Sequence, residues 1–317
     1  MYRDKKIAVV IPAYNEEKMI GRVLETMPAF VDTVIVVNDA SNDGTEAAVQ
    51  TAAAAQPERR IVSLKHERKM GNGAARVTGL HRALETDAEI VGMMDGDGQM
   101  NPDDLPALLD PIAAGEVDYT KGNRLFSGKA WEIIPRKRYY GNAALTLLTK
   151  IASGYWHIAD FQSGYAAISR KALQAIKLDH LYHDYGFPND MLIHLNVYNF
   201  RVKDIPIEPV YNIGEKSAMR LAAVIPRISR LLWRRFLWRV KQKYIIRDFH
   251  PLVFFYGLAF LLLGVSGPLL IRLIFLWIIN GKIPPLNALA LVFCVTMGFQ
   301  CLFFAMFFDM DSNKHLK

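Results

Sequence analysis

Cysteine is scarce in this sequence. Its 317 residues contain 2 cysteines, Cys294 and Cys301, and both lie inside the last long apolar run. Seven residues apart on one helix, they would be separated by about 10 Å, which is too far for a disulfide between them. We interpret both as small apolar packing residues. The cysteine content therefore excludes a disulfide-rich scaffold and gives no sign of an oxidising compartment.

The sequence also has no internal repeat, no low-complexity segment and no signal peptide of ordinary length. It begins with basic side chains, but the first apolar run ends at Pro12 and acidic residues follow within a few positions. That run is too short for a signal peptide and is typical of a first buried strand. We expect the N-terminal part of the chain to remain in the cytoplasm.

Acidic residues are missing between Lys216 and Arg247, where lysine and arginine alternate with apolar side chains. The whole chain has a formal net charge of +7, which favours an anionic partner such as nucleic acid, anionic lipid or a phosphorylated substrate. Basic amphipathic helices of this kind lie on anionic membrane surfaces. A nucleic-acid-binding helix could look similar, but the segments that follow favour a membrane, and we expect no nucleic-acid partner.

Charge is almost absent from two long segments near the C-terminus. Residues 250–279 and 286–308 are long and apolar enough to predict two transmembrane helices, the first interrupted by Arg272, which could snorkel or lie in a protein interface. Two buried core helices are the alternative, although two such lengths in succession disfavour it. The basic segment before them, residues 213–249, predicts amphipathic juxtamembrane helices and places the N-terminal domain on the cytoplasmic side of the cell membrane. The sequence therefore predicts an integral membrane protein with the lipid bilayer as a partner.

The first 212 residues alternate between apolar runs and segments with helical periodicity. Each run is short and continuous, as in strands that are covered on both faces of a parallel sheet. Alternation at this spacing predicts an α/β domain, residues 1–212, with a doubly wound, mainly parallel sheet. The clearest runs are Ile7–Ile11, Val31–Val37, Ile61–Leu64 and Ile90–Met94.

The last of these runs ends abruptly in the acidic and glycine-rich sequence Asp-Gly-Asp-Gly-Gln. Asp95 and Asp97 are two residues apart, so in an extended segment their carboxylates can point the same way. Oxygen ligands of this kind suit Mg²⁺ or Mn²⁺, usually shared with substrate phosphates. Asn101 can cap a helix that begins at Pro102, so the acidic cluster would lie where a strand ends and a helix begins. That edge of an open α/β sheet is where ligands bind, although a solvated acidic turn would have the same sequence.

Six motifs in this order and spacing resemble the family 2 glycosyltransferases of the GT-A fold. The resemblance covers roughly residues 5 to 212 and is closest to polyprenyl-phosphate glycosyltransferases similar to dolichol-phosphate mannose synthase. The motifs are IPAYNE (Ile11–Glu16), VVNDASNDGT (Val36–Thr45), MDGDGQMNP (Met94–Pro102), GNR (Gly122–Arg124), RYYGN (Arg138–Asn142) and DFQSGY (Asp160–Tyr165).

The resemblance implies a set of residues for the donor, a nucleotide-diphosphate sugar. Pro12, Tyr14 and Glu16 would line the nucleotide pocket, and Asp39 would meet the base or ribose. By the same resemblance, Asp95, Asp97 and Gln99 would hold Mg²⁺ or Mn²⁺ on the diphosphate, and Arg124 would meet a phosphate. Asp39 could instead be a plain turn or cap residue.

The glycine loop after the third strand departs from the family pattern. Many relatives carry a lysine between the two glycines, whereas this chain has Asn72 between Gly71 and Gly73. A lysine contact to the nucleotide from position 72 is therefore in doubt. The glycines would still permit close approach of the backbone to the nucleotide.

For the acceptor side the resemblance implies three further residues. Arg138 would serve an acceptor phosphate, which suits the fixed donor geometry of arginine. Asp160 would lie close to the reaction centre, and Asp190 occupies a position similar to that of a catalytic base elsewhere in the superfamily. The alternatives are purely structural roles: a solvated basic turn at Arg138, a turn held by Asp160, and an acid at a helix N-terminus at Asp190.

Together these features predict a membrane-anchored, inverting, metal-dependent hexosyltransferase that moves one sugar to a polyprenyl phosphate, with a homo-oligomer possible. A glycosyltransferase acting on a lipid hydroxyl is the nearest alternative, and it would need Asp160 or Asp190 as a base. A non-catalytic nucleotide-sugar-binding membrane protein is a third, which the intact Asp95, Asp97 and Gln99 set disfavours.

Overall fold

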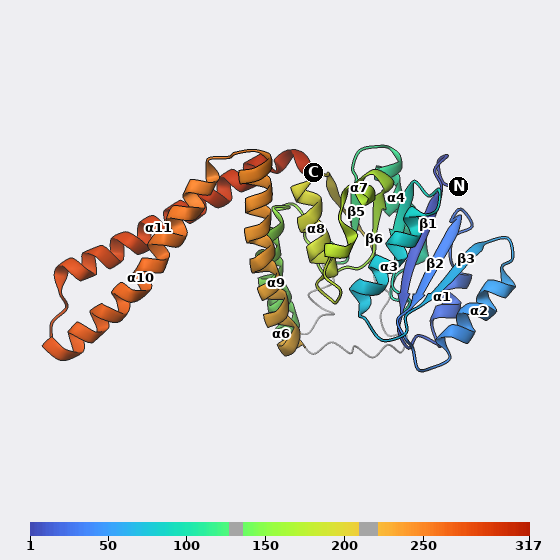
Figure 1. The fold of residues 1–317 in the computed structure, drawn as a ribbon, viewed down its shortest axis with the longest axis horizontal. Coiled ribbons are helices and arrows are strands. Elements are labelled where there is room, and N and C mark those ends of the chain that lie inside the picture. The colour runs from blue at the N-terminus through green and yellow to red at the C-terminus, as the bar shows by residue number, and fades with distance from the viewer. Residues whose placement is uncertain (127–135, 209–220) are drawn as a thin grey trace. The chain divides into compact units, whose positions relative to one another are not determined.

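The computed structural model describes residues 1–126, 136–208 and 221–317, with side chains omitted for residues 136–144 and 221–224. The chain forms two compact units, Met1–Phe236 with Leu316–Lys317 and Leu237–His315. The first unit contains the sheet and the second contains two long helices (Figure 1). The predicted boundary at residue 212 therefore differs from the observed division, because most of the helix that follows packs with the first unit.

A seven-stranded sheet in the order β3-β2-β1-β4-β6-β5-β7 forms the centre of the first unit. Strands β3, β2, β1 and β4 are mutually parallel, and β6 lies antiparallel between β4 and β5, while β5 and β7 are parallel. The mainly parallel, doubly wound sheet predicted from the sequence is therefore confirmed, with one reversed strand. The strands are β1 (Ile7–Ala13), β2 (Thr33–Asn38), β3 (Arg60–Lys65), β4 (Ile90–Met93), β5 (Tyr119–Asn123), β6 (Ala166–Ser169) and β7 (Val202–Pro206).

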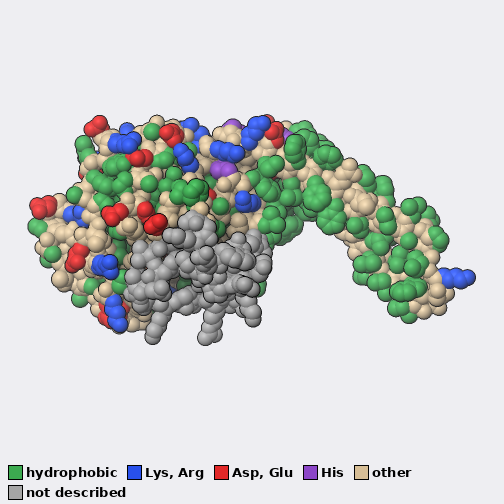
Figure 2. Space-filling model, turned by 180° about the vertical axis from the view of Figure 1, so that it is seen from behind, with side chains coloured by type: hydrophobic (Ala, Val, Ile, Leu, Met, Phe, Trp, Pro, Cys, Tyr) green, Lys and Arg blue, Asp and Glu red, His purple; other side chains and the backbone are tan. Residues whose placement is uncertain are grey.

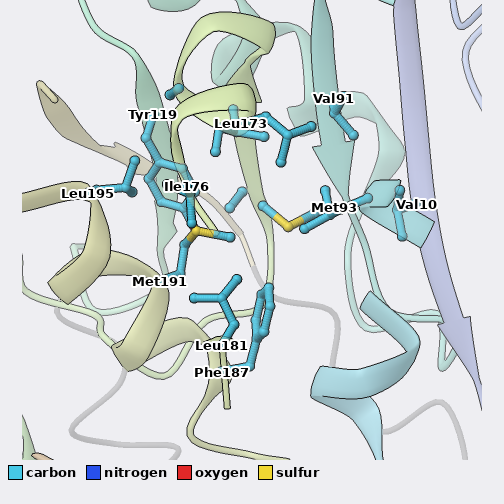
Figure 3. Packing of buried hydrophobic residues seen from close by; sticks show 14 of the residues in the cluster. Val10, Val91, Met93, Tyr119, Leu173, Ile176, Leu181, Phe187, Met191 and Leu195 are labelled. Carbon is cyan, nitrogen blue, oxygen red and sulfur yellow. The ribbon is translucent and has the colours of Figure 1, made fainter. Parts of the chain in front are cut away.

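Both faces of the sheet are covered, which explains why its central strands are continuous apolar runs. Every residue of β1 and β2 is buried. Along β1, Val10 belongs to one core cluster while Val9 and Ile11 belong to the other, as the alternation of side chains in a strand requires. Figure 3 shows the first cluster, where Met93 from β4 and Phe187 and Met191 from α8 lie close to one another.

The helices on the two faces come from different parts of the chain. Residues of α3, α7 and α8 contribute to the first cluster, and residues of α1, α2 and α4 contribute to the second. The helices are α1 (Ile20–Glu25), α2 (Thr45–Ala55), α3 (Asn72–Leu84), α4 (Leu105–Ala113), α6 (Arg136–Ser153), α7 (Arg170–Ala175) and α8 (Phe187–Val197), with short 3-10 turns η1 (Pro102–Asp104), η2 (Leu178–His180) and η4 (Lys314–Leu316).

The basic segment forms one helix, α9 (Leu221–Lys241), which continues into a π-helical turn, η3 (Gln242–Arg247). Several amphipathic helices were predicted over residues 213–249, of which 213–220 lie outside the described residues. The apolar side of α9 is buried, with Ile228, Leu232 and Phe236 all below 5% exposed. Its charged side chains at Arg230 and Arg234 are exposed, as the amphipathic pattern requires.

Two helices in the second unit are long and apolar enough to span a membrane, as predicted. They are α10 (Leu252–Asn280) and α11 (Pro285–Ser312), joined by a turn with Gly281 in the left-handed conformation. Hydrophobic side chains crowd their visible surface in Figure 2, and Arg272 is exposed on α10 rather than buried against another helix. Exposed apolar surface on this scale is what lipid contact requires.

A buried polar network ties α9 to α11 within the second unit. The guanidinium of Arg239 donates two hydrogen bonds to Asp309, at 2.8 and 2.9 Å, and both side chains are fully buried. The hydroxyl of Tyr244 donates to the same carboxylate at 2.6 Å, and Lys243 donates to Asn313 at 2.7 Å. Charged groups survive burial only when they are paired in this way.

Candidate active site

The candidate site lies where β1, β2 and β4 end. These strands are parallel, so their carboxyl ends meet at one edge of the sheet. The strand order reverses between β1 and β4, and such a switch point is where open α/β sheets bind ligands. Tyr14 and Glu16 follow β1, Asp39 follows β2 and Asp95 follows β4. The structure thus brings together the residues that the sequence assigned to the donor.

Asp95 is held by two side chains from the start of α3. Arg76 donates to Asp95 Oδ1 at 2.5 Å, and the amide of Asn72 lies 3.4 Å from the same oxygen. Arg76 is itself only 2% exposed and is fixed by Asn72 and by the carbonyl oxygen of Gly164. Because Asp95 keeps about a quarter of its surface exposed, its carboxylate is oriented by Arg76 and still reachable by a ligand.

Asp97 begins a tight turn beside Asp95. Its Oδ1 accepts the backbone N–H of Gln99 at 3.0 Å, and Gly98 has a positive φ of 76°. Glu16, from the loop after β1, is a third carboxylate of this cluster. Burial, followed by the charges of Asp97 and Asp95, raises the pKa of Glu16 to about 7. The part of this rise that comes from Asp97 and Asp95 reflects the negative charge gathered at the site.

This acidic cluster fits a divalent cation. Asp95 and Asp97 are half-buried oxygen donors, and a cation beside them would relieve the repulsion that acts on Glu16. Among the described residues no group of three or more His, Cys, Asp or Glu side chains is arranged as a complete metal cage. A site with few protein ligands is the usual arrangement when substrate phosphates supply the remainder. The roles of Asp95, Asp97 and Gln99 as metal ligands stay predictions.

Asp39 has several partners inside the protein. Its carboxylate accepts the backbone N–H groups of Met70 and Gly71, each at 2.8 Å, and it contacts Nδ1 of His66 at 2.7 Å. Although burial opposes ionisation, these partners hold the pKa of Asp39 below its usual range. The predicted contact with the base or ribose stays a prediction, and the observed contacts give Asp39 a role in shaping the glycine loop.

The glycines of that loop are required by a neighbouring segment of the chain. Gly71 has a φ of 105°, and a Cβ there would lie 2.5 Å from the carbonyl oxygen of His183. At Gly73 a Cβ would lie 2.8 Å from the backbone nitrogen of Asp184, and Ala74 N donates to His183 O at 3.0 Å. The predicted close approach to a nucleotide at Gly71 is untested, whereas close approach of residues 182–184 is observed.

Pro12 and Tyr14 lie on either side of the end of β1. The carbonyl oxygen of Pro12 accepts the N–H of Gly96 at 3.3 Å, which ties β1 to the acidic turn. Tyr14 is half-buried, and the ammonium of Lys69 lies 3.4 Å from the centroid of its ring. Lys69 is therefore a cation at the predicted nucleotide pocket, three residues before Asn72 in the same loop.

Arg124 and Asp160 form an ion pair at the end of β5. Arg124 donates through Nε to Oδ2 at 2.7 Å and through Nη2 to Oδ1 at 3.1 Å, a bidentate arrangement. Asp160 also accepts the N–H groups of Gln162 and Ser163, and it is 3% exposed. The structure therefore supports a turn-holding role for Asp160, while Arg124 keeps about a third of its surface exposed for a ligand.

Two further charged residues lie near this pair, and the sequence analysis did not predict them as site residues. Lys121 is fully buried on β5 and donates to Ser163 O at 2.5 Å, and burial lowers its pKa to about 8. Asp204 on β7 accepts from Ala159 N at 2.6 Å, and burial raises its pKa to about 6. With Asp160 and Arg124 they form a buried network of alternating charge.

Asp190 lies in the first turn of α8 and is completely buried. It forms an ion pair with Arg235 on α9, whose Nε lies 2.8 Å from Oδ1, and its Oδ2 accepts from Arg235 Nη2 and from Tyr182 N, both at 2.9 Å. The helix N-terminal position expected of a structural acid is therefore observed, together with a cation that the sequence gave no reason to place there. Its assignment as a catalytic base stays a prediction without geometric support.

Arg138 is placed in the first turn of α6 with Arg136 and Lys137. The side chains of all three lie outside the described residues, so the predicted contact with an acceptor phosphate stays a prediction. Arg76 is the donor-side residue that sequence reasoning overlooked. Its signal was a position four residues after Asn72 on one helix face, a spacing at which side chains meet.

Comparison with known proteins matches residues 8–177 to the family model for glycosyl transferase family 2. A similar protein is the UDP-N-acetylglucosamine–dolichyl-phosphate N-acetylglucosaminyltransferase of Methanococcus voltae, 31% identical over 219 residues, or 66% of this chain and 87% of the relative. Another is the undecaprenyl-phosphate mannosyltransferase of Micrococcus luteus, 31% identical over 207 residues, or 64% of this chain and 82% of that protein.

Solved structures agree with the fold. Glucosyl-3-phosphoglycerate synthase from Mycobacterium tuberculosis, crystallised with Mn²⁺, uridine diphosphate and glucosyl-3-phosphoglycerate, has a TM-score of 0.51 at 22% identity. The match covers 74% of this chain and 80% of that one. The GT-A arrangement expected from the motifs is therefore confirmed as the fold of the sheet domain.

Proposed function

The chain belongs to glycosyl transferase family 2, and we propose that it transfers one sugar from a nucleotide-diphosphate sugar to a polyprenyl phosphate with inversion at the anomeric carbon. The observation that carries the donor half is the cluster of Asp95, Asp97 and Glu16 at the switch point of the sheet. Its negative potential suits Mg²⁺ or Mn²⁺ on a diphosphate, and that cation would offset the charge that develops on the leaving nucleotide.

The ion pairs of the two acidic candidates support a phosphate acceptor over a hydroxyl acceptor. A lipid hydroxyl needs a base, yet Asp160 is held by Arg124 and Asp190 by Arg235. Arg124 holds the pKa of Asp160 below its usual range, which makes Asp160 a weak base. Both carboxylate oxygens of Asp190 are in contact with Arg235. A phosphate is already ionised at neutral pH and needs positioning and charge shielding instead. The dolichyl- and undecaprenyl-phosphate acceptors in the names of similar proteins support the same class.

Two arginines are assigned to the phosphates under this proposal. Arg124 lies at the carboxyl end of β5 with a third of its side chain exposed, and it would meet a phosphate oxygen at that exposed part. Arg138, at the start of α6, would meet the acceptor phosphate. Single displacement would then require only that the acceptor oxygen lie in line with the bond that breaks.

The apolar helices support the lipid nature of the acceptor. A chain with α10 and α11 in a bilayer keeps its catalytic unit at the surface where a polyprenyl phosphate presents its head group. The basic face of α9 suits an anionic leaflet, which supports a cytoplasmic location for the catalytic unit.

A transfer assay tests the proposal. Membranes that contain the chain would be incubated with UDP- and GDP-sugars labelled in the sugar, with undecaprenyl or dolichyl phosphate, and with Mg²⁺ or Mn²⁺. We expect label in the lipid phase with the phosphate and none with the matching polyprenol. Transfer to the polyprenol or to diacylglycerol would instead establish the hydroxyl acceptor. Nucleotide binding without any transfer would establish the non-catalytic alternative.

A further inference from the structure

Helix α9 does more than cover the catalytic unit, because it contacts a segment that reaches the donor site. The segment is residues 178–186, which connects α7 to α8 through the short turn η2. Arg235 Nη2 donates to the carbonyl oxygen of His180 at 2.5 Å as well as to Asp190. Arg235 therefore joins α9, this connecting segment and the first turn of α8 at one point.

Asp190 holds the same segment from its other side. Its Oδ2 accepts Tyr182 N at 2.9 Å, and the carboxylate is completely buried. Close packing also holds the segment against α9. Gly186 lies so near Leu231 of α9 that a Cβ at Gly186 would be 2.6 Å from the leucine side chain. Removing the charge of Arg235 would leave the buried carboxylate of Asp190 without that cation, a costly state that the segment would relieve by shifting. Removing the charge of Asp190 would take away the carboxylate that holds Arg235 in place.

Residues 182–184 then rest on the glycine loop of the donor site. His183 O accepts Ala74 N at 3.0 Å and fills the space beside Gly71. The loop in turn carries Asn72, whose amide faces Asp95, and it leads into Arg76, which donates to Asp95 at 2.5 Å. Contiguous contacts thus run from a basic, membrane-type helix to the carboxylate assigned to the cation.

We propose that Arg235 and Asp190 are positioning residues for the donor site, and that docking of α9 on the catalytic unit sets the glycine loop and Asp95 in the nucleotide-binding arrangement. The inference rests on the proposed function in that it takes a nucleotide diphosphate with its cation as the ligand of this edge. It assigns Asp190 a role through the loop rather than on the acceptor. Release of α9 would weaken donor binding even with every donor residue intact.

The test uses the full chain in detergent micelles with five variants, one of which, Arg235→Lys, keeps the positive charge. Arg235→Gln and Asp190→Asn each remove one charge, and the double variant removes both. Arg234→Gln is the matched control, an exposed arginine one position away on the same helix. Binding of UDP and of GDP, each with Mn²⁺, is measured by calorimetry without acceptor, so failure of the acceptor assignment cannot affect the result.

We expect each single variant to bind the better nucleotide about tenfold more weakly, and the double variant to be no weaker than the worse single variant. Arg235→Lys, which keeps a cation opposite Asp190, should recover part of the affinity, and Arg234→Gln should bind like the unmodified chain. Hydrogen exchange should accelerate at the amides of Met70, Gly71 and Ala74 in Arg235→Gln and stay unchanged in the control.

Two results would overturn the proposal. Lower melting temperatures with unchanged nucleotide affinity and unchanged exchange in the loop would make the pair purely structural. Unchanged nucleotide affinity with turnover lost in Asp190→Asn, but retained in Arg235→Gln, would make Asp190 the base of a hydroxyl-acceptor enzyme. If Asp190→Asn does not fold, Arg235→Gln and Arg235→Lys decide the matter alone, because Arg235 is partly exposed and its removal is better tolerated.

Discussion

Two groups of carboxylates lie at the same sheet and differ in how their charge is balanced. Glu16, Asp95 and Asp97 gather at the ends of β1 and β4, where Arg76 is the cation bound to Asp95 and the pKa of Glu16 rises to about 7. Asp160 is paired with Arg124 at the end of β5, Asp204 lies in the middle of β7, and Lys121 is close to both. Although burial opposes ionisation there too, Arg124 holds the pKa of Asp160 below its usual range.

The difference distinguishes a group of carboxylates that favours binding of a cation from a group whose charge is balanced within the protein. The first group has negative charge in excess, so a cation binds it favourably. The second group supplies its own cations, so its carboxylates act as scaffold and only the exposed part of Arg124 faces outward. Residue type alone would not separate the two, since both contain aspartates beside strand ends.

The largest effect on activity is expected from a substitution in the first group, at Asp97. We expect Asp97→Ala to lower turnover by about two to three orders of magnitude, because a bound cation contributes several kcal/mol to stabilising the charge of the transition state. Circular dichroism should show an intact fold. EDTA should lower the turnover of the unmodified chain in the same way. Added Mg²⁺ or Mn²⁺ should restore turnover after EDTA treatment, but should not restore it in Asp97→Ala. Full turnover in EDTA would show that the cluster has no metal role.

Arg124→Ala tests the part of the second group that is exposed to a ligand. We expect turnover to fall about tenfold to a hundredfold, since a lost charged hydrogen bond costs about 1.5–3 kcal/mol. Asp160→Asn keeps Arg124 and keeps a side-chain oxygen that can accept the N–H groups of the turn. The turnover of this variant should therefore fall less than that of Arg124→Ala. The opposite order in steady-state kinetics would show that Asp160 reacts directly with a substrate.

Lys121→Met tests whether the second group is balanced internally. Loss of the ammonium leaves Ser163 O without its donor and Asp160 with Arg124 as its remaining cation. We expect thermal unfolding to reveal a loss of about 2 kcal/mol in stability. Nucleotide affinity should stay unchanged, because the hydrogen bond of Lys121 goes to Ser163 O and not to a carboxylate of the acidic cluster. A change in nucleotide affinity without a change in melting temperature would contradict the separation of the two groups.

The last effect is expected at Asp204 and depends on pH. Its pKa is raised to about 6 in the folded chain, so between about pH 4 and 6 the folded state binds more protons than the unfolded state. Its contribution to stability is present at low pH and is lost as pH rises through 6. Asp204→Asn removes this loss, so the variant should gain up to about 3 kcal/mol relative to the unmodified chain between pH 4 and pH 7.5. Melting temperatures of both proteins across that range provide the measurement, and parallel curves would refute the assignment.

The parallel half of the sheet could be predicted from the sequence because its strands are continuous apolar runs. Asp95 and Asp97 could be predicted because they follow such a run directly. Arg76 and Lys121 could not, since a single cation on a helix or strand normally lies on the solvated face, and its burial depends on partners distant in sequence. The same limit applies to Asp190, whose partner Arg235 is 45 residues further along the chain. Pairing of that kind is set by tertiary packing and leaves no local pattern.

The paired Arg239 and Asp309 have a consequence for how the chain is made. A ribosome synthesises Arg239 70 residues before Asp309, so the whole helical hairpin must be made before the guanidinium meets its carboxylate. A nascent or truncated chain that stops short of Asp309 loses that partner and keeps a charge whose burial is unfavourable. The last turn of α9 can therefore settle only after α11 has been synthesised as far as Asp309.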